Sequence, residues 1–189
     1  MKRIAIFASG SGTNAENIIK YFQKSSVASV VHVLSNKKDA KVLGRSKSLK
    51  VSSLYFRKDD FFINDTVLNL LKKEADLIVL AGFLWRVPSK IIKAFPNRIV
   101  NIHPALLPKY GGKGMYGMYV HEAVKNNYEK ETGITIHYVN ENYDEGAIIF
   151  QKSVEIEIDD SPEDIAQKVH KLEYEYFPKV IEQLLLKDE

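Results

Sequence analysis

The amino-acid sequence predicts an α/β protein with a doubly wound, mostly parallel sheet and antiparallel strands in its C-terminal part. Short apolar runs alternate with segments of helical spacing over residues 3–103, as in parallel sheets that helices cover on both faces. A glycine-rich turn follows the first apolar run directly. Beyond residue 132 the pattern changes to two alternating segments, 133–139 and 147–156, which favour an antiparallel pair of strands.

The parallel strands are expected where the apolar runs are nearly continuous, at residues 3–8, 27–34, 51–56, 76–80 and 98–103. Amphipathic spacing predicts helices between them, at residues 15–22, 41–49, 60–74 and 88–95. The apolar side chains of segment 60–74 fall on one side, so one continuous helix is expected there. This order of strands and helices implies right-handed crossovers.

The C-terminal part is expected to begin with an irregular surface loop, because residues 106–117 contain four glycines and a proline. A helix is predicted next, at residues 119–126. Ser161, Pro162 and the acidic residues after them predict the start of a last helix that continues to residue 186. Its apolar stripe is expected to consist of Ile165, Val169, Leu172 and Tyr176.

Composition limits the domain organisation and the class of protein. A chain of 189 residues that is 45% hydrophobic can bury one sizeable core, so a single domain, 1–189, is expected. The net charge of +3, from 27 basic and 24 acidic residues, argues against a nucleic-acid binder with a broad cationic face. The absence of cysteine excludes disulfides and thiolate chemistry. No apolar stretch approaches about 18 residues, so no membrane span and a cytoplasmic location are expected.

The predicted strand at residues 98–103 leads into Asn101-Ile102-His103-Pro104. Because side chains alternate along a strand, Asn101 and His103 are expected on one face and Ile102 in the core on the other. Pro104 has no N–H group and ends the strand at the sheet edge where α/β proteins bind ligands. The pattern indicates either a reaction centre or a histidine that is hydrogen-bonded for structural reasons.

The glycine-rich turn has the pattern Gly10-x-Gly12-x-x-Ala15. A strand, a glycine turn and a helix start together present free backbone N–H groups to an anion. The spacing also fits a loose dinucleotide fingerprint, but Ser35 and Asn36, followed by two lysines, stand where such a site needs an acidic residue. A phosphomonoester therefore fits better than NAD, and the lysines leave NADP open.

Asp144 lies in a turn between the last two predicted strands. Aspartates in turns commonly hydrogen-bond their own backbone. Alternatively, the turn carries the carboxylate to His103, where it would raise the imidazole pKa and favour the imidazolium as a general acid. His137 is expected either to hydrogen-bond a site residue or to be an ordinary half-buried side chain. The histidine spacings do not favour a metal site.

Glu173 and His170 lie three residues apart beside the apolar stripe of the last helix, and a surface position is the default expectation for both.

The serines of the glycine turn do not form a nucleophile elbow. The candidate groups are therefore an amide, an imidazole and a carboxylate. Such a set suits direct attack of a bound amine on a carbonyl, with donors that stabilise the oxyanion.

Several stretches together resemble the phosphoribosylglycinamide formyltransferases (glycinamide ribonucleotide transformylases) of the folate-dependent formyltransferase superfamily. They cover nearly the whole chain in the family's order: residues 9–14 (SGSGTN), 81–84 (AGFL), 101–110 (NIHPALLPKY) and 133–139 (GITIHYV), which leads to 144–146 (DEG). The resemblance implies a Rossmann-like formyltransferase fold. It also implies formyl transfer from 10-formyltetrahydrofolate to the amine of 5-phosphoribosylglycinamide, in de novo purine biosynthesis.

The resemblance implies a catalytic trio of Asn101, His103 and Asp144. His103 would act as general acid and oxyanion partner, and Asn101 would hold the formyl or tetrahedral oxygen. Asp144 would raise the pKa of His103. These roles come from the family and not from the spacing of the residues.

The resemblance also implies two binding regions, with a phosphate-binding half at residues 1–100 and a folate-binding and catalytic half at residues 101–189. Substrate contacts are implied for Gly12, Thr13, Asn14, His170 and Glu173. Folate contacts are implied for Lys58, Leu84, Trp85, Arg86, Val87, Asn101, Val139 and Asn140, with Arg57 as the alternative to Lys58. The pterin would lie against residues 84–87 and 140–144.

The family implies no tightly bound cofactor, because 10-formyltetrahydrofolate would be a co-substrate. The expected partners are the two small-molecule substrates, and the expected assembly is a monomer or a homodimer. One alternative is a superfamily member that acts on methionyl-tRNA or an amino sugar, although such proteins usually carry an added C-terminal domain. Another is a dinucleotide-binding or regulatory module.

Overall fold

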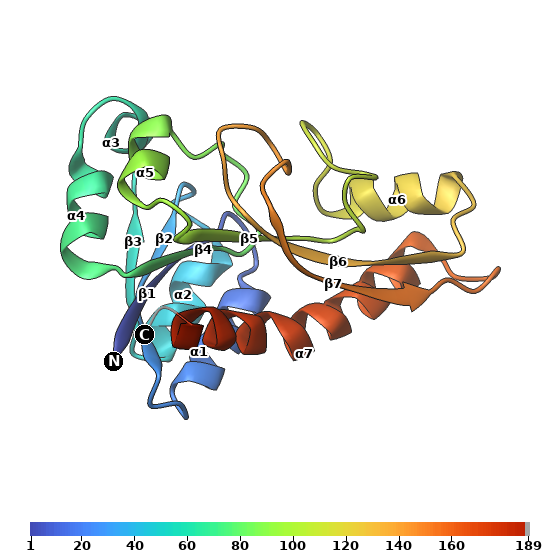
Figure 1. Cartoon of the computed structure of the whole chain (residues 1–189), viewed down its shortest axis with the longest axis horizontal. Helices are drawn as coiled ribbons and strands as arrows, with labels where there is room; N and C mark the ends of the chain where they lie inside the picture. The colour runs from blue at the N-terminus through green and yellow to red at the C-terminus, as the bar shows by residue number, and fades with distance from the viewer. Residues whose placement is uncertain (188–189) are drawn as a thin grey trace.

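The computed structural model describes residues 1–187 as one seven-stranded sheet flanked by helices (Figure 1). The strand order is β3-β2-β1-β4-β5-β6-β7. Strands β1 to β5 pair in parallel, whereas β6 pairs antiparallel with both β5 and β7. The predicted α/β class is confirmed, together with its antiparallel C-terminal part.

The parallel strands are β1 (Lys2–Phe7), β2 (Ala28–Ser35), β3 (Ser52–Tyr55), β4 (Leu77–Leu80) and β5 (Ile99–His103). Alternation along β1 divides its side chains between two apolar clusters on opposite faces of the sheet. Ile4 and Ile6 belong to one cluster, and Ala5 and Phe7 belong to the other. Every residue of β4 is buried, as expected for a strand that helices cover on both sides.

Helices α1 (Thr13–Phe22), α2 (Lys41–Ser48) and α7 (Pro162–Lys187) cover the face that carries Ile4 and Ile6. Helices α3 (Lys58–Phe62), α4 (Thr66–Glu74) and α5 (Ser89–Ala94) cover the opposite face. Figure 1 shows α7 running along β6 and β7 and ending beside α1, near the N-terminus. The middle of this helix passes the start of α1, where Asn14 Nδ2 donates to Glu173 Oε2.

The segment 60–74 is not one helix, and the prediction of a continuous helix there was wrong. The chain leaves the helical path at Asn64, whose N–H donates to the Asp59 carbonyl oxygen at 2.9 Å. The Asn64 Oδ1 then accepts the Thr66 N–H at 3.0 Å and starts α4. An asparagine side chain that bonds the backbone in this way competes with helix continuation, although the apolar spacing carries on across the break.

The C-terminal part consists of α6 (Met118–Asn126), β6 (Glu131–Tyr138), β7 (Ile148–Glu155) and α7. Residues 104–117, before α6, contain no helix or strand, as the glycine content predicts. The antiparallel register places Asn101 opposite His137 and His103 opposite Thr135. This register determines which β6 side chains reach the end of β5.

The start of α7 is capped as the sequence predicts. The Ser161 N–H donates to Asp164 Oδ2 at 2.9 Å, and the Asp164 N–H donates back to Ser161 Oγ at 3.2 Å. In the predicted stripe, Ile165 and Val169 are fully buried, while residues 172 and 176 are partly buried.

Within residues 1–187, no helix has both the length and the apolarity that a membrane crossing requires.

Candidate active site

The strand order reverses between β1 and β4, the place where open α/β sheets bind ligands. The loops after these two strands are joined, because the Ser9 N–H donates to the Gly82 carbonyl oxygen at 3.0 Å. Ser9 Oγ donates to Asn36 Oδ1 at 2.7 Å and accepts the Leu84 N–H at 3.0 Å. A cleft of about 730 Å³ opens here and extends past the end of β5 to α6 and α7.

Asn101 and His103 both line this cleft. Ile102 between them contributes to the apolar core and is 6% exposed. The predicted alternation at the end of β5 is therefore confirmed. Because the strand is hydrogen-bonded to β4 on one side and to β6 on the other, the two polar side chains have a fixed spacing.

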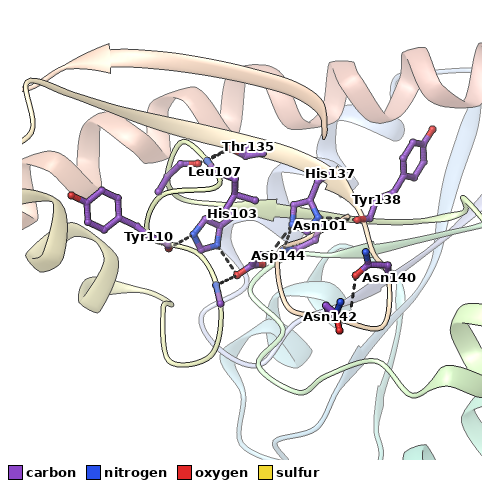
Figure 2. A network of polar contacts seen from close by, with 12 residues as sticks. Asn101, His103, Leu107, Tyr110, Thr135, His137, Tyr138, Asn140, Asn142 and Asp144 are labelled. Atoms are coloured by element: carbon purple, nitrogen blue, oxygen red, sulfur yellow. Dashed lines mark hydrogen bonds and ion pairs between the residues drawn. The ribbon is translucent and has the colours of Figure 1, made fainter. Parts of the chain in front are cut away.

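The His103 ring lies between groups from two loops, as the dashed lines in Figure 2 show. Its Nε2–H donates to the Tyr110 carbonyl oxygen at 2.7 Å. Its Nδ1 lies 3.6 Å from Asp144 Oδ2, which is too long for a direct hydrogen bond. The Nδ1 atom is therefore the ring nitrogen that remains for exchange of a proton.

Burial lowers the pKa of His103, and this effect outweighs the opposite influence of the Asp144 charge and the Tyr110 carbonyl. The net direction is therefore opposite to the expectation that a raised pKa of His103 favours its imidazolium. The cause is that the side chain is only 4% exposed, so the cost of removing a charged ring from water dominates. Asp144 itself acts on the His103 pKa in the expected direction.

Asp144 lies in the β6–β7 loop with a left-handed backbone conformation, φ 56°. Its Oδ2 accepts the Gly112 N–H at 2.9 Å, and its Oδ1 lies 3.6 Å from His137 Nε2. Burial alone would raise the pKa of Asp144, but the two imidazoles and the Gly112 N–H together hold it below its usual range. The turn thus delivers an ionised carboxylate to His103, and the purely local role for Asp144 does not hold.

His137 is buried and hydrogen-bonds a site residue, which resolves the two interpretations left open by the sequence. Its Nδ1 lies 2.8 Å from the Tyr138 carbonyl oxygen and therefore carries the proton in the neutral ring. Its Nε2 then accepts from Asn101 Nδ2 at 3.1 Å. This chain of bonds fixes which way the Asn101 amide faces.

The other end of the cleft is the start of α1. Gly12 precedes the helix at φ 75°, and a Cβ at this position would overlap the Val42 side chain, so only glycine fits. The first N–H groups of the helix, at Thr13 and Asn14, have no partner within a regular helix, and both residues line the cleft. Lys37, one of the two lysines that follow Ser35 and Asn36, lines the same cleft.

Glu173 is 4% exposed, so the default expectation of a surface position was wrong. Its Oε2 accepts from Asn14 Nδ2 and contacts His170 Nδ1, both at 2.8 Å. The hydrogen bond to Glu173 raises the pKa of His170. Glu173 is buried because α7 packs on α1, a contact between residues 159 positions apart that helical spacing alone does not show.

His121 on α6 also lines the cleft and was not predicted to be a site residue. Its ring is 2% exposed, and burial lowers its pKa to about 4. Within residues 1–187, no hydrogen-bond partner reaches its buried Nδ1. A histidine on an otherwise ordinary amphipathic helix carries no sequence signal for this position. Residues 1–187 contain no cluster of three or more potential metal ligands.

Only some of the residues implied for folate contacts line the cleft or the pocket beside it. Leu84 lines the large cleft, and Arg86 lines an adjoining pocket of about 230 Å³ next to Lys113. Trp85 packs into an aromatic cluster with Phe56, Phe61, Phe62 and Phe83. The others lie away from the cleft lining: Val87 is buried in the core, Val139 is partly buried, and Asn140, Arg57 and Lys58 are exposed.

Comparison with known proteins gives a consistent result. Residues 2–181 match the family model described as formyl transferase. The phosphoribosylglycinamide formyltransferase of Bacillus subtilis is 37% identical over 191 residues, which cover 98% of this chain and 95% of that protein. The chloroplastic Arabidopsis thaliana enzyme is 39% identical over 187 residues, but this chain spans only 64% of its length.

The solved structures agree with the sequence relatives. The phosphoribosylglycinamide formyltransferase of Bacillus halodurans has a TM-score of 0.87 and 37% identity, with 100% of this chain and 97% of that chain covered. The glycinamide ribonucleotide transformylase 1 of Geobacillus kaustophilus has a TM-score of 0.88 at 33% identity, with 98% and 99% covered. The glycine turn, the Asn101–His103 strand end and the Asp144 loop thus belong to a full-length match, and this chain is a member of the formyl transferase family, among the phosphoribosylglycinamide formyltransferases.

Proposed function

We propose that the protein transfers the formyl group of 10-formyltetrahydrofolate to the amino group of 5-phosphoribosylglycinamide. The observation that carries the proposal is one continuous cleft with an anion-binding helix start at one end and Asn101, His103 and Asp144 at the other. Its volume of about 730 Å³ is within the range for sites that take small organic ligands. Membership of the family supports the same substrates.

The reaction requires no covalent enzyme intermediate. The substrate amine attacks the formyl carbon, the new N–C bond forms, and the carbonyl electron pair moves to the formyl oxygen. Breakdown of this tetrahedral adduct breaks the bond to N10 of the folate, and the proton lost by the amine replaces the formyl group there. The enzyme has to stabilise the oxyanion and guide the protons.

Asn101 and His103 are the groups that we assign to the oxyanion. The Asn101 amide donates one N–H to His137 and has a second N–H for the oxygen of the adduct. A proton on His103 Nδ1 would face the same space, stabilised by the ionised Asp144 at 3.6 Å. The lowered pKa of His103 makes its imidazolium a stronger acid toward the oxyanion.

The ribonucleotide is assigned to the α1 end of the cleft. The N–H groups of residues 12–14 and the positive end of the helix suit a phosphate, and Lys37 adds a charge. Glu173, held by Asn14 and His170, is assigned to a polar contact with the rest of this substrate. The folate is assigned to the side of the cleft lined by Leu84 and Asp144 and to the adjoining pocket lined by Arg86 and residues 141–143.

The direct experiment is an assay with 5-phosphoribosylglycinamide and 10-formyltetrahydrofolate that follows the release of tetrahydrofolate. His103→Gln and Asp144→Asn should each reduce kcat by about 100-fold or more, since each removes general-acid or oxyanion stabilisation. Binding of the ribonucleotide, measured by calorimetry, should change little in both variants. Near-wild-type turnover in either variant would show that the assigned roles are wrong.

The alternative functions are tested in the same preparation. Titration with NADPH tests the dinucleotide-binding module, and formyl acceptance by methionyl-tRNA or an amino sugar tests other members of the superfamily. Binding of NADPH without any formyl transfer would contradict the proposal. The state of assembly, monomer or homodimer, remains a prediction for a hydrodynamic measurement.

A further inference from the structure

One short turn, residues 109–112, contacts both members of the His103–Asp144 pair. The carbonyl oxygen of Tyr110 accepts the His103 Nε2–H at 2.7 Å, and the Gly112 N–H donates to Asp144 Oδ2 at 2.9 Å. The turn belongs to the loop before α6 and has no regular secondary structure of its own. Its backbone geometry therefore decides how the imidazole and the carboxylate face each other.

The backbone of Tyr110 is in the left-handed region, φ 57°, which is unfavourable for a residue other than glycine. Contacts of the Tyr110 side chain offset the cost of this backbone conformation. Its hydroxyl donates to Glu129 Oε1 at 2.9 Å, and its ring packs against the small apolar cluster of Ala105, Val120 and Val124. Glu129 lies just beyond the end of α6, so it connects the turn to a part of the molecule outside the cleft.

The Tyr110–Glu129 bond is present over a wide pH range. Burial, together with the hydrogen bond to Glu129, raises the pKa of Tyr110 to about 12, so its hydroxyl keeps the proton that it donates. The Lys109 ammonium, 2.8 Å from Glu129 Oε1, and the Tyr110 hydroxyl lower the pKa of Glu129. The acceptor therefore stays ionised while the donor stays neutral.

The Tyr110 carbonyl selects the tautomer of His103. A carbonyl oxygen accepts hydrogen bonds only, so the neutral ring places its single proton on Nε2 and leaves Nδ1 as the basic nitrogen. Without this carbonyl, the competing tautomer with its proton on Nδ1 would be stabilised by Asp144. In that tautomer Nδ1 would already carry a proton and Nε2 would be the basic nitrogen, so Nδ1 could not take up the proton that the substrate amine loses.

We propose that Tyr110 and Glu129 are positioning residues that hold the His103 ring in its Nε2–H tautomer through the Tyr110 carbonyl. The proposal rests on the function proposed above only for its effect on turnover. The effect on the tautomer is a property of the protein alone. Neither side chain touches the reacting atoms, since each acts through the backbone of the turn.

The test combines ¹⁵N NMR of the histidine rings with steady-state kinetics. The His103 signals are assigned from their absence in His103→Gln, at a pH where the ring is neutral. The wild type should show Nε2 as the protonated nitrogen. Glu129→Ala and Tyr110→Phe should show signals averaged between the two tautomers and a kcat lowered by about tenfold, as expected when a catalytic group is misplaced.

Two further variants separate this role from a general loss of stability. Glu129→Gln keeps an oxygen that accepts the Tyr110 O–H, so it should retain the Nε2–H tautomer and most of the turnover. Glu182→Ala is the matched control, because Glu182 accepts the Tyr21 O–H at 2.6 Å between α1 and α7, away from the His103 turn. It should reduce stability and leave the His103 signals unchanged.

The inference is overturned if Glu129→Ala and Tyr110→Phe retain the wild-type tautomer, whatever happens to their kcat. It is also overturned if Glu129→Gln fails to retain it, or if Glu182→Ala disturbs the His103 signals as strongly. Failure of the proposed function looks different, because the wild type would then transfer no formyl group although its NMR signals report the Nε2–H tautomer.

Discussion

At the residue scale, the site depends on the balance between burial and charge at His103. Burial is the larger influence and lowers the His103 pKa, whereas the carboxylate of Asp144 raises it. The proximity of Asn101, His103 and Asp144 was expected from the strand end, the turn and the family resemblance. The direction in which the His103 pKa changes could not be predicted from the sequence, because it depends on how much of the surrounding structure excludes water.

The opposing influences predict the effect of Asp144→Asn on the titration of His103. Removal of the negative charge 3.6 Å from Nδ1 eliminates the contribution that raises the pKa, so the His103 pKa should fall further. An NMR titration of the ring in the wild type and the variant measures this change. An unchanged or higher pKa in Asp144→Asn would contradict the account of the pair.

His121 predicts a second pH effect, on stability. Its pKa is about 4 in the folded protein, below the ordinary 6.5 of the unfolded chain. Between these values the unfolded chain binds a proton that the folded protein does not, so the free energy of unfolding falls as the pH drops from 6.5 to 4. The full effect is about 3 kcal/mol. Urea denaturation at several pH values should show a weaker fall in His121→Gln than in the wild type.

This comparison isolates one group among several. The lowered pKa of His103 produces a loss of stability with the same sign, and it is present in both proteins. The difference between the wild type and His121→Gln should therefore change with pH through the window from 6.5 to 4. A difference that stays constant across that window would show that the buried ring of His121 does not titrate as described.

At the element scale, the strands were predicted well and the long-range helix contacts were not. Apolar runs identify β1 and β4 because a strand that is buried on both faces consists of consecutive apolar residues. The break at Asn64 was missed because apolar spacing continues across it. The burial of Glu173 was missed because it depends on the packing of α7 against α1.

The start of α1 predicts a cost for any side chain at position 12. Gly12→Ala would place a Cβ against Val42 and hold a left-handed backbone without glycine. We expect a loss of about 1–3 kcal/mol in the free energy of unfolding and a higher KM for the ribonucleotide. Urea denaturation and steady-state kinetics measure the two effects.

A matched control for this variant is Gly44→Ala, which lies inside α2 with open space around the added carbon. This substitution should leave the KM unchanged and should not destabilise the protein, because alanine favours a helix more than glycine does. If Gly12→Ala behaved like Gly44→Ala, the tight turn would not be required for the anion end of the cleft.

At the scale of the whole molecule, three distant parts of the chain meet at one cleft. The β1–α1 turn lines one part of it, β5 and the β6–β7 loop bring Asn101, His103 and Asp144, and α7 closes the side with Glu173. Sequence reasoning predicted each part separately, and the resemblance supplied their common function. The sheet order β1-β4-β5-β6 explains why the parts lie side by side.

The account is tested most directly by following the formyl carbon itself. The wild-type protein is incubated with 5-phosphoribosylglycinamide and 10-formyltetrahydrofolate labelled with ¹³C in the formyl group, and NMR identifies the product. We predict that the label moves to the amino nitrogen of the glycinamide as tetrahydrofolate accumulates in equal amount. Label that stays on the folate, or that is released as formate without the formylated ribonucleotide, would contradict the account.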